Sequence, residues 1–97
     1  ITSIEPGLYR AGQWGVRIEN LVLNVEHETP EQGAFGTMLA FGTLTLCPID
    51  TRPIDRSLMR ADEIACLNQY HATVRDRLLP RVSGAAREWL LRRTEAI

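Results

Sequence analysis

Two glutamates, fourteen positions apart, are the residues whose type and spacing point most directly to chemistry. Glu5 and Glu19 each lie in an apolar stretch that favours β-strands, where an unpaired carboxylate is costly. If two strands and a looping connection bring them face to face, one carboxylate must take up a proton or a cation must neutralise both. Divalent cations favour carboxylate oxygens, and two ions roughly 3.5–4 Å apart can activate a shared water for hydrolysis. A dinuclear metal site is therefore one interpretation.

The alternative is a pair of ordinary surface charges. Arg17 and Glu19 fall on the same face of a predicted strand, about 7 Å apart, and would form an ion pair there, with Glu5 a simple turn acid. A two-metal site also needs more ligands, usually including histidine, and the chain contains only two histidines. We expect His27 to be solvated in a loop, and His71 to be a core histidine bonded to backbone.

Composition excludes several classes of function. The 97 residues allow one domain at most, and a net charge of −1 gives no reason to expect nucleic-acid binding. Cys47 and Cys66 form no metal-binding or disulfide pattern, and no apolar run is long enough to cross a membrane. We therefore expect a cytoplasmic protein. Because the chain opens at Ile1 with a strand already under way, we expect it to be part of something longer.

The elements that must position these residues follow an α+β order, strands first and helices second. We predict strands over 1–5, 16–25 and 37–46, with loops over 7–14 and 27–36. Helices are predicted over 62–79, where apolar residues recur every three to four positions, and over 83–94. We expect the second helix to bury Ala86, Trp89 and Leu90.

Longer motifs carry a resemblance to a known family. The runs Ile4-Glu5-Pro6-Gly7-Leu8-Tyr9 and Trp14-Gly15-Val16-Arg17-Ile18-Glu19-Asn20 closely resemble the last metal-binding segment of the Xaa-Pro aminopeptidases (aminopeptidase P) of the pita-bread metallopeptidase superfamily. The resemblance covers nearly the whole chain and continues through Thr43-Leu44-Thr45-Leu46-Cys47-Pro48-Ile49-Asp50, Leu67-Asn68-x-Tyr70-His71 and Trp89-Leu90.

This resemblance implies both a fold and an activity. Residues 1–47 would be the last antiparallel strands of a pita-bread catalytic domain, and residues 48–97 a two-helix C-terminal extension. The intact enzyme would release the N-terminal residue from peptides with proline at position two. It would use two divalent metal ions, with manganese the family's usual ion and zinc or cobalt as alternatives.

The resemblance also implies a role for each matching residue. Glu5 would bind one metal ion and shuttle a proton, Glu19 would bridge both ions, Arg17 would support the catalytic ligand network, and Tyr9 would lie near the bound substrate. The family uses two further aspartates and a histidine, which would lie upstream of Ile1. We therefore expect the 97 residues alone to be inactive and to hold no metal tightly.

Partners follow from the same resemblance. We expect a peptide substrate with proline at position two, the upstream part of the same polypeptide, and a second copy in a homodimer, but neither nucleic acid nor membrane. Two alternatives stay open: a self-associating interaction module, and a non-catalytic relative of the pita-bread fold.

Overall fold

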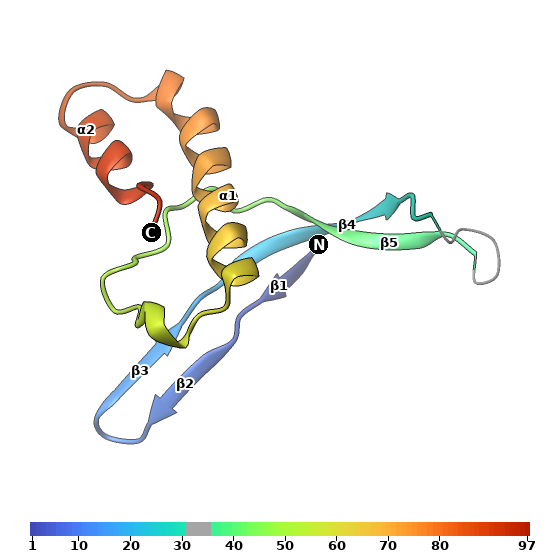
Figure 1. Ribbon diagram of the computed structural model, residues 1–97, viewed down its shortest axis with the longest axis horizontal. Coiled ribbons are helices and arrows are strands. Elements are labelled where there is room, and N and C mark those ends of the chain that lie inside the picture. Colours follow the sequence, from blue (N-terminus) through green and yellow to red (C-terminus); the bar gives the residue numbers. More distant parts are fainter. Residues whose placement is uncertain (31–35) are drawn as a thin grey trace. The chain divides into compact units, whose positions relative to one another are not determined.

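The computed structural model describes residues 1–30 and 36–97, which form two compact units, residues 1–45 and 46–97 (Figure 1). Unit 1 holds all the described strands and unit 2 all the described helices. The predicted strands-then-helices order is confirmed. The assignment of residues 1–47 to a catalytic domain and 48–97 to an extension stays a prediction.

Unit 1 is antiparallel throughout. β1 (Thr2–Ile4), β4 (Asn20–His27) and β5 (Met38–Thr43) form a sheet with β4 in the middle, while β2 (Gly7–Arg10) and β3 (Trp14–Arg17) form a hairpin. Val22 on the central strand is buried, with 4% of its surface exposed. Many other large apolar side chains of this unit, including Leu39 and Phe41, lie exposed.

Two predictions about the strands were wrong. Residues 7–14, predicted as a loop, contain β2, and the strand predicted over 16–25 is interrupted between β3 and β4. Gly12 supplies the turn of the hairpin, with φ of 69°, a left-handed conformation that glycine adopts at little cost. The strands predicted over 1–5 and 37–46 are confirmed as β1 and β5. The loop predicted over 27–36 includes residues 31–35, which lie outside the described residues.

In unit 2 the helices lie close to the predicted bounds. η1 (Arg56–Leu58) precedes α1 (Ala61–Leu78), and η2 (Leu79–Arg81) separates α1 from α2 (Gly84–Arg93). The Glu63 carboxylate accepts from the Arg60 backbone N–H and so caps the start of α1. Pro80 lies in η2, because proline cannot continue an α-helical ladder. None of the described helices is long and apolar enough to cross a membrane.

Two side chains on the inner face of α1 organise the core of unit 2. His71 and Val74 are fully buried, and Leu90 of α2 is 2% exposed. Burial of Leu90 is as predicted, but Ala86 and Trp89 lie exposed. The physical reason is the rotation of α2, which turns Leu90 inward and leaves Trp89 beside a cavity of about 240 Å³.

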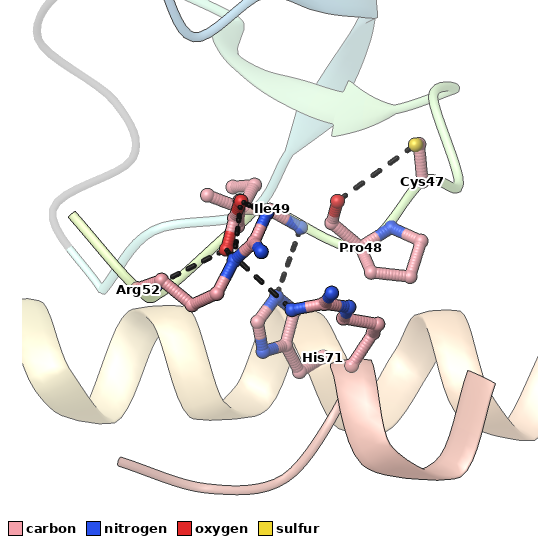
Figure 2. A network of polar contacts seen from close by, with 7 residues as sticks. Cys47, Pro48, Ile49, Arg52 and His71 are labelled. Atoms are coloured by element: carbon pink, nitrogen blue, oxygen red, sulfur yellow. Dashed lines mark hydrogen bonds and ion pairs between the residues drawn. The ribbon is translucent and has the colours of Figure 1, made fainter. Parts of the chain in front are cut away.

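Polar contacts tie the irregular segment 46–54 to α1. The Ile49 backbone N–H donates to His71 Nε2 at 3.0 Å, so the prediction of a core histidine bonded to backbone is confirmed (Figure 2). Next to it, Arg52 Nε donates to both carboxylate oxygens of Asp50, at 2.9 and 3.0 Å. These bonds hold the pKa of Asp50 well below its ordinary value of 3.8.

Candidate metal-binding carboxylates

The strands of unit 1 place Glu5 and Glu19 directly opposite each other. In both the β1–β4 and the β2–β3 pairings, facing residues lie symmetrically about Gly12, so the two pairings share one register. Continued through the interruption, that register pairs Glu5 with Glu19. Figure 1 shows the two chain segments, β1 followed by β2 and β3 followed by β4, running side by side. We call this antiparallel pair of segments, residues 2–10 and 14–22, the ribbon.

The hydrogen bonds explain why the ribbon is interrupted at this place. The Ile18 backbone N–H donates to the Pro6 carbonyl at 3.2 Å, but Pro6 has no N–H with which to return the bond. Hydrogen-bonded and non-hydrogen-bonded pairs alternate along an antiparallel ribbon, so the neighbouring pair, Glu5 and Glu19, is of the second kind. In such pairs the Cα atoms lie about 4.5 Å apart and the side chains are at their closest.

One guanidinium joins the two carboxylates. Arg17 Nε lies 3.1 Å from Glu19 Oε2 and 3.8 Å from Glu5 Oε2. These two oxygens are therefore at most 6.9 Å apart, the sum of the two distances. Both carboxylates are partly exposed, 49% for Glu5 and 44% for Glu19, so a cation can reach them from solvent. Directly opposed like charges destabilise a ribbon, and the positive charge of Arg17 offsets that repulsion.

Further polar side chains lie on the same face of the ribbon. The Ser3 hydroxyl donates to Glu5 Oε1 at 2.8 Å, and Arg17 Nη1 donates to the Tyr9 hydroxyl at 3.4 Å. The hydrogen bond to Tyr9 is the largest cause that raises the pKa of Arg17 above its ordinary value, and the negative charge of Glu19 also raises it. All four residues named for the site from sequence, Glu5, Tyr9, Arg17 and Glu19, thus lie on one face.

The carboxylates of Glu5 and Glu19 provide some of the ligands that a divalent cation needs, but not a full set. Two opposed carboxylates offer hard oxygen atoms to one or two ions. However, residues 1–30 and 36–97 contain no group of three or more His, Cys, Asp or Glu side chains that could hold a metal ion. His71 is fully buried in unit 2, and its Nε2 accepts from Ile49. Within the described residues, the ribbon face therefore offers two carboxylates, and a complete metal centre would need further ligands.

Sequence reasoning missed Ser3 and the hairpin that aligns the two glutamates. A usable signal was present, because Leu8 and Val16, like Glu5 and Glu19, lie at equal distances on either side of Gly12. A turn centred on Gly12 brings each such pair together.

Comparisons with known proteins extend these observations. A family model described as the C-terminal region of peptidase M24 matches residues 37–97. An uncharacterized peptidase of Schizosaccharomyces pombe is 40% identical over 97 residues, which is all of this chain and 16% of that protein. Xaa-Pro aminopeptidase 2 of Sus scrofa is 38% identical over 100 residues, covering 99% of this chain and 14% of that protein.

A solved structure shows the same fold. The X-prolyl aminopeptidase of Caenorhabditis elegans, described as a cytosolic enzyme with a di-nuclear active site, superposes with a TM-score of 0.84 at 35% identity. The match covers 98% of this chain and 16% of that one. The predicted fold class, α+β with the last antiparallel strands of a pita-bread domain followed by two helices, is confirmed. The chain spans about one sixth of the length of these relatives.

Proposed function

Because the chain belongs to peptidase family M24, we propose that it is the C-terminal part of a metal-dependent Xaa-Pro aminopeptidase. Its identity to Xaa-Pro aminopeptidases extends over nearly its whole length and so includes the ribbon as well as the helices. The single observation that carries the proposal is the direct opposition of Glu5 and Glu19, on a ribbon register that leaves their carboxylates facing one another.

In this proposal each side chain of the ribbon face has a task. Glu19 and Glu5 would help to hold the divalent ions, and Glu5 would also pass a proton to the departing proline nitrogen. Bound ions of this kind activate water and polarise the peptide carbonyl. Arg17, in contact with both carboxylates, orients them, and Ser3 fixes one oxygen of Glu5 through its hydroxyl. We propose manganese as the ion, with zinc or cobalt as alternatives.

The open faces of unit 1 support the upstream polypeptide as a partner. On the ribbon face opposite the glutamates, a cavity of about 270 Å³ is lined mainly by apolar residues, among them Ile4, Ile18 and Phe41. Exposed apolar surface of this kind is costly in water. We propose that the remaining polypeptide, which is about five sixths of the length of the relatives, packs on unit 1 and brings the missing ligands. The isolated chain would then be inactive.

Activity of the full-length polypeptide tests the proposal. With manganese, it should release the first residue from a peptide with proline at position two, and much less from the same peptide with alanine there. Glu19→Gln should lower kcat/KM by more than the roughly 10–100-fold that loss of a supporting residue costs. Glu26→Gln, which changes an exposed glutamate on β4, is the matched control and should leave kcat/KM unchanged. Equal cleavage of both peptides would refute the Xaa-Pro assignment.

Location and assembly complete the proposal. We propose a cytoplasmic enzyme, as the Caenorhabditis elegans relative is described, which acts as a homodimer. Sedimentation of the full-length polypeptide at several concentrations tests the dimer, and a strictly monomeric species would count against it. A non-catalytic relative of the fold has no need of two opposed carboxylates, and their presence favours the enzyme.

A further inference from the structure

The Tyr9 ring rests on two glycines of the hairpin. Gly7 faces Arg17 across β2 and β3, and Tyr9 faces Gly15. A Cβ atom at Gly7 would lie 2.6 Å from the Tyr9 hydroxyl oxygen, and one at Gly15 would lie 2.6 Å from Tyr9 Cδ1. Neither glycine has a positive φ, so their backbone conformation does not require glycine. Glycine is required at both positions because a side chain there would enter the space that the Tyr9 ring occupies.

This arrangement serves a polar contact rather than core packing. Tyr9 is 62% exposed, so its ring contributes little to a hydrophobic core. Flat on the glycines, the ring brings its hydroxyl to Arg17 Nη1, at 3.4 Å, while Nε of the same guanidinium faces the two glutamates. Because a guanidinium is planar and rigid, a contact at one nitrogen fixes the direction of the others.

We propose that Tyr9 is a positioning residue of the carboxylate pair: seated on Gly7 and Gly15, it fixes Arg17, which holds Glu5 and Glu19 in place. This inference rests on the proposed function and deepens it. It gives Tyr9 a different task from the substrate contact that the family resemblance implies. It also gives the two glycines a role, because any larger residue would displace the ring.

Metal affinity tests the proposal in the full-length polypeptide after its metal has been removed. Tyr9→Phe keeps the ring and removes the hydroxyl, so the manganese dissociation constant from calorimetry should rise about 10-fold. Gly15→Ala displaces the ring and should have a similar effect. In the Tyr9→Phe background, Gly15→Ala should add little, because the contact with Arg17 is already lost. Wild-type affinity in Tyr9→Phe, or effects that multiply in the double variant, would overturn the proposal.

A control and a second readout separate this proposal from the proposed function. Gly42→Ala makes the same change in β5, where a Cβ would come no closer than 3.5 Å to another atom, and should leave the affinity unchanged. Hydrogen exchange of Arg17 Nε–H, followed by NMR of ¹⁵N-labelled arginine side chains in the same protein, needs no metal. It should be faster in Tyr9→Phe and Gly15→Ala than in the wild type. If the wild type binds no manganese, the proposed function fails, whereas equal exchange rates in these variants would refute the role of Tyr9.

Discussion

The buried histidine of α1 makes the stability of unit 2 depend on pH. His71 is fully buried, and its Nε2 can accept from Ile49 only while that nitrogen carries no proton. Burial is the main cause that lowers the pKa of His71 below its ordinary 6.5. The charge of Arg75 acts in the same direction, and the backbone of Glu95 opposes it. The perturbation we consider is His71→Gln, which offers Ile49 a carbonyl acceptor that does not titrate.

The direction in which the free energy of unfolding changes with pH follows from proton binding. Between the lowered pKa of the folded state and the ordinary 6.5, the unfolded chain binds more protons, so the free energy of unfolding rises with pH. This contribution is complete above pH 6.5 and is lost as pH falls toward the folded pKa. One group changes the free energy of unfolding by at most about 1.4 kcal/mol per pH unit. The wild type should therefore lose up to about 1.4 kcal/mol between pH 6.5 and 5.5 relative to His71→Gln.

Urea denaturation of the 97-residue chain measures this difference in the free energy of unfolding. Each unit contains one of the two tryptophans, so a Trp14→Phe background leaves Trp89 as the reporter of unit 2. The free energy of unfolding of the wild type minus that of His71→Gln, taken from pH 5 to 7.5, cancels the groups that both proteins share. His71→Ala should cost about 2–5 kcal/mol at pH 7.5, because it leaves the Ile49 N–H unpaired beside a cavity. A difference between wild type and His71→Gln that does not change with pH would refute the reasoning.

Three further predictions follow from the contacts. Thr94 is 1% exposed, and its hydroxyl accepts from Arg75 Nε at 2.9 Å. Thr94→Val should therefore lower the free energy of unfolding by about 1–3 kcal/mol. The exposed control Thr73→Val should change it by less than about 0.5 kcal/mol. Val74→Ala should cost about 2 kcal/mol in the same urea assay, and Val82→Ala, at a half-buried position of the same unit, clearly less. Calorimetry of the 97-residue chain with manganese should show no tight binding, and a tight two-ion stoichiometry would contradict the proposed dependence on upstream ligands.

The helices could be predicted from sequence because their signal is local. The apolar stripe of α1 repeats with the helical period and ends next to Pro80, so the predicted and observed bounds differ by one residue at each end. The prediction for Trp89 was wrong because a ten-residue helix has few apolar positions, and composition alone does not fix its rotation. Packing of Leu90 decides it.

The hairpin could not be predicted from local preference. Gly7 and Gly15 lower the strand propensity of residues 7–17, since glycine is depleted in strands. In the structure both are strand residues whose missing side chains leave room for Tyr9. The two acidic residues could be named from sequence, but their direct opposition depends on a register shared by two pairings, which is a tertiary property.

The symmetry of the ribbon about Gly12 constrains how this segment can evolve. Facing positions are set by the number of residues between them, and neighbouring strand residues point to opposite faces. An insertion or deletion of a single residue in one segment of the ribbon, between Glu5 and Gly12 for example, would shift the pairing register by one residue. Glu5 would then point to the face opposite Glu19. The length of this stretch is therefore expected to be as invariant among active homologues as the two acidic residues themselves.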